Sequence, residues 1–213
     1  MDRLFDLLMA FQGGGVFNPY RDRDPALDCF DAPAIRRANL RRYLDIFADA
    51  AYVLMGEAAG YAGCRFSGIP FTGEVQLLGP EPLPWATAGD WGQTSLGAPW
   101  RERSAQIVWS ALDDRQDCVL WNAFPWHPFK DKPLSNRRPR VRELRQATDV
   151  LRCFLSLFSQ AQVYAIGRVS QGLLQDLGVK AAYIRHPSYG GKRAFVAGVT
   201  ALPRRRPSRR LSR

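Results

Sequence analysis

The amino-acid sequence predicts an α/β protein, a three-layer α/β/α sandwich with a four-stranded parallel sheet. Short apolar segments of strand character alternate with longer segments in which apolar residues recur at helical spacing. Consecutive strands that are joined by helices form parallel sheets with helices on both faces. Three of the four strand-like segments run directly into loops rich in glycine, proline or histidine.

The elements of the first half lead into the first strand of this sheet. They are a helix at 2–11, a loop at 16–33, a helix at 34–50 and a strand at 51–55, which Gly56 ends. Residues 77–100 are dense in Gly and Pro, and we expect a long surface loop there.

The second half supplies the other three strands. Its predicted elements are a helix at 104–113, a strand at 117–122, a helix from about 139 to 159, a strand at 162–166, a helix at 169–177, a strand at 181–185 and a helix at 192–200. Three prolines between 125 and 133 predict irregular structure there, and Ser135 or Asn136 is expected to cap the following helix.

Composition indicates one globular domain, residues 1–202, followed by a basic disordered tail at 203–213. The tail has six arginines and no acid, which suits a polyanion such as DNA. No apolar run approaches 18 residues, and the amino-terminal segment has the pattern of an amphipathic helix, so we expect a cytoplasmic protein. We also expect a monomer. Four cysteines without a close pair predict no metal site.

Three loops at predicted strand ends carry the candidate chemistry. They are GEAAG at 56–60, NAFPWHP at 122–128 and HPSYGG at 186–191, and both histidines of the chain, His127 and His186, lie in them. The carboxyl ends of parallel strands meet at one edge of a sheet, where ligands bind. The sequence therefore predicts one pocket built from these loops.

These segments resemble the motifs of the uracil-DNA glycosylase superfamily, in the same order along residues 50–195. Residues 56–60 look like its first motif, in the form with glutamate second, and residues 68–71 are similar to its G-x-x-F segment. Asn122 matches the base-reading asparagine, and residues 186–188 match its His-Pro-Ser motif. The resemblance implies a uracil-DNA glycosylase-like fold and a repair enzyme that removes flipped-out uracil from single- or double-stranded DNA, without metal or cofactor.

The resemblance also implies roles for single residues. Asn122 would read the base, His186 would hydrogen-bond a uracil oxygen, and Glu57 would orient the attacking water. Phe71 would stack on the base, with Phe66 as the competing candidate. The other expected substrate contacts are Gly56, Ala58, Gly60, Tyr61 and Ser188. The expected DNA contacts are Arg137, Arg138, Tyr189, Lys192 and Arg193, and Tyr189 or Arg193 would fill the gap left by the flipped base.

Departures from the superfamily pattern favour an alternative function. Ala58 stands where efficient members have an aspartate, Ala59 replaces a proline, and Gly60 replaces an aromatic residue that excludes thymine; Tyr61 or Tyr189 would have to form that wall. The alternative is a DNA-binding member whose activity is lost or redirected to other deaminated bases or to covalent capture of abasic DNA.

Two further questions stay open in the sequence. His127 is either a functional group, acting as a second acid–base or water-holding residue or, as the resemblance to a few superfamily members implies, bonding covalently to DNA, or a histidine packed among Pro125, Trp126 and Pro128. A nucleotide-binding oxidoreductase is disfavoured, because the glycine spacing at 56–63 is not the G-x-G-x-x-G of dinucleotide-binding turns.

Overall fold

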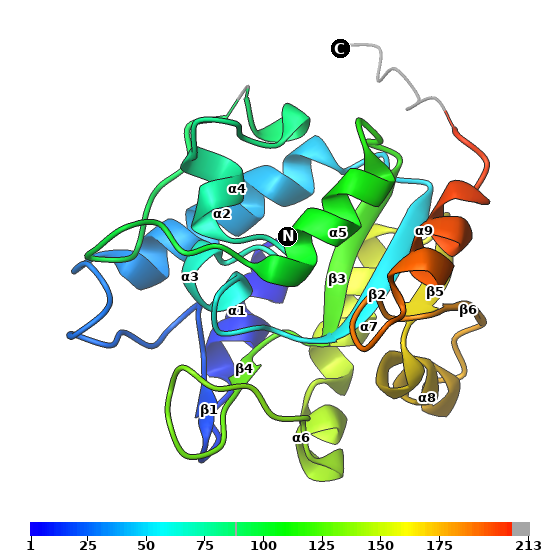
Figure 1. Ribbon diagram of the computed structural model, residues 1–213. Helices are drawn as coiled ribbons and strands as arrows, with labels where there is room; N and C mark the ends of the chain where they lie inside the picture. Colours follow the sequence, from blue (N-terminus) through cyan, green and yellow to red (C-terminus); the bar gives the residue numbers. More distant parts are fainter. Residues whose placement is uncertain (88, 206–213) are drawn as a thin grey trace.

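Four parallel strands form the central sheet of the protein (Figure 1), and the computed structural model describes residues 1–87 and 89–205. Side by side, the strands are β3 (Cys118–Phe124), β2 (Tyr52–Ala58), β5 (Gln162–Ile166) and β6 (Ala181–Ile184). All seven residues of β3 and the first five of β2 are buried, as expected for a sheet that is covered on both faces. The predicted fold class is confirmed.

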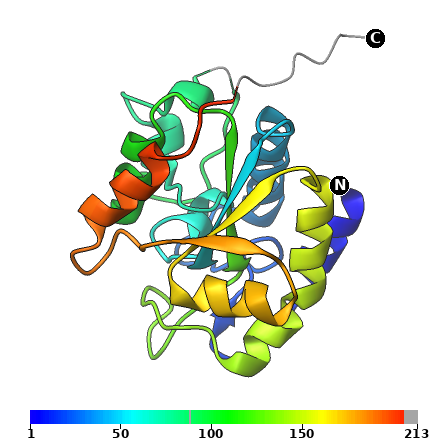
Figure 2. The same ribbon diagram turned by 90° about the vertical axis from the view of Figure 1, so that its right-hand side faces the viewer.

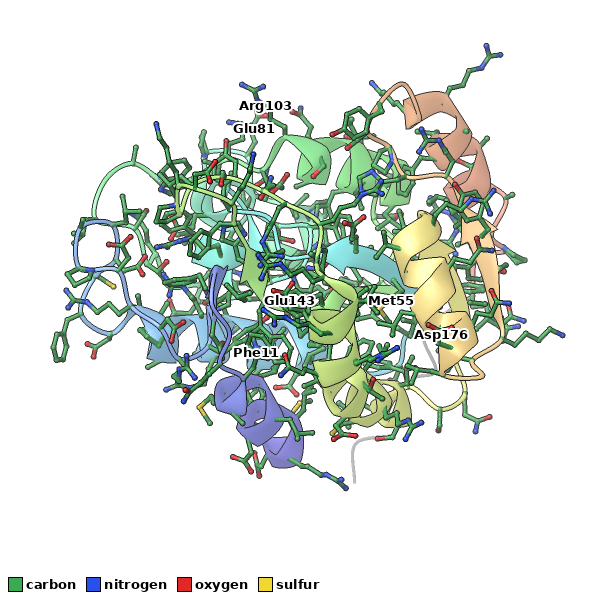
Figure 3. The ribbon with its side chains drawn as sticks, turned by 90° about the horizontal axis from the view of Figure 1, so that it is seen from below. Phe11, Met55, Glu81, Arg103, Glu143 and Asp176 are labelled. Carbon is green, nitrogen blue, oxygen red and sulfur yellow. The ribbon has the colours of Figure 1, made fainter. Side chains whose placement is uncertain are left out.

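Helices cover both faces of this sheet, as Figures 2 and 3 show from two further directions. One face carries α5 (Arg103–Leu112) and α9 (Lys192–Thr200), and the other carries α6 (Val141–Gln146), α7 (Thr148–Leu157) and α8 (Arg168–Asp176), with α1 (Asp2–Ala10) packed on α7. Trp121 of β3 stacks on Phe154 of α7 with ring centroids 4.1 Å apart.

Helix α2 (Ala32–Ile46) protects the edge of the sheet that β3 forms. The Tyr43 hydroxyl accepts a hydrogen bond from the Leu120 amide at 2.7 Å and donates one to the Leu120 carbonyl at 3.2 Å. An edge strand with free backbone groups invites pairing with another chain, and this side chain satisfies two of those groups.

Both strands that carry the first two motifs are longer than predicted. Gly56 pairs with Asn122 and Ala58 pairs with Phe124, so β2 continues through the motif and β3 continues past Asn122. The prediction that Gly56 ends the first strand is therefore wrong. The ladder with β3 holds the backbone extended at a glycine that alone would favour a turn.

A two-stranded ribbon occupies two regions that were predicted to be irregular. Strand β1 (Val16–Phe17) pairs antiparallel with β4 (His127–Pro128). The Phe129 amide extends this contact by donating to the Gly15 carbonyl at 3.0 Å. The ribbon places His127 against the first-motif strand, which matters for the site.

The long helix predicted from about 139 to 159 is two helices, α6 and α7, separated at Ala147. The predicted caps Ser135 and Asn136 are also wrong, because α6 starts after Arg140. The Glu143 carboxylate accepts from the Arg140 amide at 2.6 Å and from the Arg137 guanidinium at 2.8 Å, which fixes the helix start.

Residues 77–100 form a largely irregular segment with many exposed residues, as predicted, but a part of it packs into the core. The short helices of this part of the chain are α3 (Cys64–Ser67), α4 (Glu74–Leu78) and the 3-10 helix η1 (Pro84–Ala86). Trp85 and Trp91 are buried and contact each other, and Trp85 also contacts Trp109 of α5. The buried Glu74 carboxylate accepts from the Thr94 and Ser95 amides at 2.6 and 3.0 Å.

The start of the predicted basic tail lies at the opposite edge of the sheet from the motif loops. The Arg205 amide donates to Asp117, directly before β3, at 2.8 Å, and Arg115 donates to the Leu202 and Pro203 carbonyls. Residues 206–213, the rest of that tail, lie outside the described residues. None of the helices within 1–87 and 89–205 combines the length and apolar character that crossing a membrane requires.

Candidate active site

The candidate site lies at the carboxyl edge of the sheet, the edge that faces the viewer in Figure 3. Strands β2 and β3 bring Gly56 and Asn122 side by side there. The loop after β6 joins them through Gly167, which follows β5: its amide donates to the Ile184 carbonyl at 3.0 Å, and its α-carbon faces His186. All three motif loops therefore reach one edge, as the sequence predicts.

Asn122 is buried, and its side-chain amide has no hydrogen-bond partner among the residues that the structure describes. Only 2% of the residue is exposed. Its Oδ1 atom lies 3.0 Å from the place that a Cβ on Gly56 would take. Neither amide atom is fully enclosed, because in the described part of the chain the fully buried side-chain atoms without a partner belong to Tyr52, Arg65, Trp85 and Trp121. A donor and an acceptor therefore remain accessible to a ligand at the strand ends.

Phe71 lies beside Asn122, whereas Phe66 does not. A Cβ on Gly56 would overlap the Phe71 ring, so the glycine leaves the ring room to sit against β2. Phe71 has a φ of 53°, an unfavourable backbone conformation for a bulky residue, and Trp109 holds its carbonyl by donating at 3.1 Å.

Phe66 has a structural environment instead. Its side chain is fully buried, Trp100 stacks on the ring at 4.8 Å, and the Arg65 guanidinium lies over it at 4.1 Å. Of the two phenylalanines that spacing left open, Phe71 is thus the one that lies beside Gly56 and Asn122.

Glu57 stands next to Gly56 and points away from the Asn122 side. Side chains alternate along a strand, and the Glu57 carboxylate interacts electrostatically with Arg138 on its side. Partial burial raises the pKa of Glu57, and Arg138 offsets a part of that rise. A ligand that contacts both Glu57 and Asn122 must lie across the carboxyl end of β2.

The loop after β6 fixes the tautomer of His186. The Ser188 amide donates to Nδ1 at 3.1 Å, so a neutral ring carries its proton on Nε2. Burial lowers the pKa of His186, and the nearby Arg185 lowers it further, which keeps the ring neutral. The site thus has a neutral imidazole with an N–H donor on its free nitrogen.

The same loop ends in an exposed aromatic side chain. Tyr189 is 98% exposed and has a φ of 53°. Gly191 packs so closely that a Cβ there would overlap the His186 carbonyl oxygen. Lys192 and Arg193, exposed at the start of α9, follow directly.

Glu102 is a neighbour of the first motif that sequence reasoning missed. Its Oε2 atom lies 2.8 Å from the place of a Cβ on Gly60 and 2.7 Å from that of Gly63. The space that a larger side chain at position 60 would need is therefore taken by Glu102. In the sequence, only Gly60 and Gly63 indicate a close neighbour at this place, and they do not identify it as Glu102.

Tyr61 lies on the same side as Glu102. Its amide donates to Asn136 Oδ1 at 3.1 Å, and its ring contacts Trp100 edge-on with centroids 6.1 Å apart. Ala58, between Glu57 and this loop, is partly exposed.

His127 is fully buried and contacts the backbone on both sides. Its Nδ1 lies 3.0 Å from the Ala59 carbonyl oxygen, and its Nε2 lies 2.9 Å from the Pro133 carbonyl oxygen. Burial lowers the pKa of His127 more than these two carbonyls raise it. The residue has the packed environment that was one of its two interpretations.

The neighbouring arginines 137 and 138 differ in environment. The Arg137 guanidinium donates to both Glu143 oxygens at 2.8 Å and to the carbonyls of Gly15 and Phe129 at 2.9 Å. The Arg137 guanidinium is therefore occupied by contacts within the protein, whereas Arg138 is exposed beside Glu57.

Comparison with solved structures fits this geometry. The crystal structure of wild-type Pedobacter heparinus SMUG2 is similar to this chain with a TM-score of 0.58 and 10% sequence identity, over 94% of each chain. The chain has a uracil-DNA glycosylase-like fold. No protein-family model matches the chain, and no curated protein sequence does.

Proposed function

We propose that the protein is a DNA glycosylase that hydrolyses the N-glycosidic bond of uracil flipped out of DNA. The observation that carries this proposal is the Asn122 side-chain amide, which has no partner among the described residues and lies beside the strained Phe71 at the carboxyl edge. The glycosylase-like fold supports the same assignment.

Asn122 and Phe71 are proposed to select the base. The amide would accept from the uracil N3–H with Oδ1 and donate to O4 with Nδ2, a pattern that cytosine reverses. Phe71 would stack on the ring of the base. A base inside a duplex cannot reach a buried amide, so the nucleotide has to be extruded first.

Glu57 and His186 are proposed to carry the chemistry. As the bond between N1 and the sugar breaks, the sugar gains positive charge and the base leaves with its electron pair. Glu57 would stabilise the cationic sugar and accept a proton from the water that attacks C1′. His186 would donate from Nε2 to the uracil O2 as negative charge develops there. Ala58 has no carboxyl group, so Glu57 would have to orient and deprotonate the water without help from residue 58.

The DNA is proposed to cross the carboxyl edge between two exposed basic groups. Arg138 lies on the Glu57 side, and Lys192 and Arg193 lie beyond the His186 loop. Each would hold a phosphate without reading sequence. Tyr189 is proposed to fill the gap that the flipped base leaves.

A single-turnover assay on an end-labelled oligonucleotide with one central uracil, followed by alkali to cleave abasic sites, tests the function. We expect cleavage by the wild type and losses of about 100-fold or more in Glu57→Gln, Asn122→Ala and His186→Ala, the size found for single catalytic groups. Glu81→Gln, which changes an exposed carboxylate in the 77–100 segment, should cleave like the wild type. Equal activity of Glu57→Gln and the wild type would contradict the role of Glu57.

The second candidate is a DNA-binding protein with lost or redirected activity, and Ala58 is the residue that favours it. Retained binding without uracil removal would support it, and oligonucleotides with other deaminated bases would then be tested. A slowly migrating band on a denaturing gel would indicate covalent capture. Because His127 is buried, capture by that residue would also require its loop to open.

A further inference from the structure

We propose that His127 is a positioning residue that fixes the first-motif loop by donating a hydrogen bond from Nδ1 to the Ala59 carbonyl. The residue belongs to β4, whose pairing with β1 sets the place of its backbone. The consequence for catalysis rests on the proposed glycosylase function, whereas the hydrogen bond itself does not.

The two partners of the imidazole are both acceptors. Nδ1 faces the Ala59 oxygen at 3.0 Å, and Nε2 faces the Pro133 oxygen at 2.9 Å. A neutral imidazole has one N–H, and an imidazolium has two. The proposal therefore requires a proton on Nδ1, which the imidazolium and the neutral ring protonated on Nδ1 both supply. Only the neutral ring with its proton on Nε2 leaves the Ala59 carbonyl without this hydrogen bond.

The backbone amide of Ala59 makes a hydrogen bond as well. Its amide donates to the Phe124 carbonyl at 3.2 Å, one step beyond the β2–β3 ladder. A proline in this position has no N–H and would lose that bond. Two residues further, the Tyr61 amide donates to Asn136 Oδ1 at 3.1 Å. Residues 59–61 are thus held by β3 from one side and by the segment that contains His127 and Asn136 from the other.

This arrangement bears directly on Glu57, which lies two residues before Ala59 in the same extended backbone. Its carboxylate has no hydrogen-bond partner among the described residues, so its place depends on the backbone that carries it. Misplacement of a reacting group by about 1 Å costs about 100-fold in rate. Loss of the bond to Ala59 should therefore lower the rate of the chemical step with little effect on DNA affinity.

Two substitutions of similar polarity separate this role from mere filling of space. The amide nitrogen of His127→Asn lies near the place of Nδ1 and can donate to Ala59, whereas that of His127→Gln lies near the place of Nε2 and can reach Pro133. We expect the single-turnover rate to stay within about 5-fold of the wild type in His127→Asn and to fall 10- to 100-fold in His127→Gln and His127→Phe. If only volume mattered, the smaller asparagine would be the worst of the three.

Hydrogen exchange gives a readout that needs no activity. The amides of Ala59 and Tyr61 should exchange at least 10-fold faster in His127→Gln and His127→Phe than in the wild type and in His127→Asn. Faster exchange in a protein that acts on no base would keep the positioning role and reject the glycosylase. Unchanged exchange and unchanged rates in His127→Phe would reject the positioning role alone.

The wild type supplies a test that does not depend on folding of the variants. Nitrogen NMR of the labelled imidazole reports which ring nitrogen carries the proton. A protonated Nδ1 is the expected result. A neutral ring protonated on Nε2 would overturn the proposal, whatever the variants do.

Discussion

At the scale of single residues, two buried asparagines show how differently one side chain is used. Asn18 is 1% exposed, donates to the carbonyls of Leu8 and Phe11 at 2.8 and 3.2 Å, and accepts from the Tyr20 amide at 3.0 Å. Asn122 is 2% exposed and makes no such bond within the described residues. The polar atoms of Asn122 are not fully enclosed, so water can bind them until a ligand takes its place, and their lack of a protein partner costs the fold little.

The pair gives a matched test of stability. Asn122→Ala should change the free energy of unfolding by less than about 1 kcal/mol, whereas Asn18→Ala should lower it by about 2–3 kcal/mol, because the backbone groups that Asn18 binds lose their partner. Urea denaturation of both variants measures the difference. A large destabilisation by Asn122→Ala would mean that the side chain has a structural role after all.

Two glutamates predict opposite effects of pH on stability. The pKa of Glu57 is raised by burial, so its charge destabilises the fold above that pKa. Burial also acts on Glu143, but Arg137 and the Arg140 amide hold its pKa below the ordinary value, so its charge stabilises the fold. Glu57→Gln should therefore raise the unfolding free energy at pH 7, and Glu143→Gln should lower it.

Both differences should shrink as the pH falls, because the wild-type carboxylates take up protons. The difference at Glu57 begins to shrink when the pH reaches the raised pKa of Glu57, above 4.5. The difference at Glu143 goes on shrinking below pH 4.5, because the pKa of Glu143 is lowered. Denaturation midpoints between pH 4 and 8 provide the measurement. A destabilised Glu57→Gln at pH 7 would contradict the unfavourable burial of this carboxylate.

At the scale of elements, the loop after β6 depends on a close approach at Gly191. A Cβ there would overlap the His186 carbonyl oxygen, so Gly191→Ala must shift the His186 loop. We expect a loss of activity of 10-fold or more with the rest of the fold intact. Gly172→Ala in α8 is the control: no atom lies within 4 Å of its new Cβ, and it should stabilise the helix by about 0.5–1 kcal/mol with unchanged activity. Equal activities of the two variants would show that the loop tolerates the shift.

The elements also show what the sequence can and cannot predict. Four strands and their order along the chain follow from apolar runs and helical periodicity, which are local properties. The ends of β2 and β3 do not, because Gly56 stays extended only through its pairing with Asn122. Strands β1 and β4 have two residues each, which is too short for a periodic sequence pattern, so only their pairing with each other defines them as strands.

The same limit applies to the candidate site. The motifs predict which loops meet, since all follow parallel strands. The choice of Phe71 over Phe66, the inward turn of Arg137 and the approach of Glu102 to Gly60 depend on contacts between residues far apart in the chain. A basic side chain in a loop looks the same in the sequence whether it faces solvent or a buried carboxylate.

At the scale of the whole molecule, a buried ionic cluster joins the segment before α2 and α2 itself to α3, which follows the first motif. One oxygen of Asp28 contacts the guanidinium groups of Arg36 and Arg65 at 2.6 Å, and all three side chains are fully buried. Phe17 lies against both arginines, with Arg65 at 4.2 Å from its ring centre. Burial opposes the charge of Asp28, but Arg65 and Arg36 together keep its pKa below the ordinary value.

Removal of the Asp28 charge should destabilise the whole protein. Asp28→Asn leaves two buried guanidinium groups without their counter-charge, which costs about 3–5 kcal/mol. Asp24→Asn is the control, because Asp24 is partly exposed and lies 3.7 Å from Arg65, a contact worth at most about 1 kcal/mol. Calorimetric melting of both variants checks the difference, and similar melting temperatures would show that the cluster contributes little.

The attachment of residues 203–205 beside Asp117 has a practical consequence for how the protein is handled. Anything joined beyond residue 205 starts from the amino edge of the sheet, on the far side from Asn122 and His186. A fluorophore or an affinity handle linked there would be attached far from the carboxyl edge. A biosensor chip linked there would leave that edge facing the bulk solution, where a long nucleic acid could reach it.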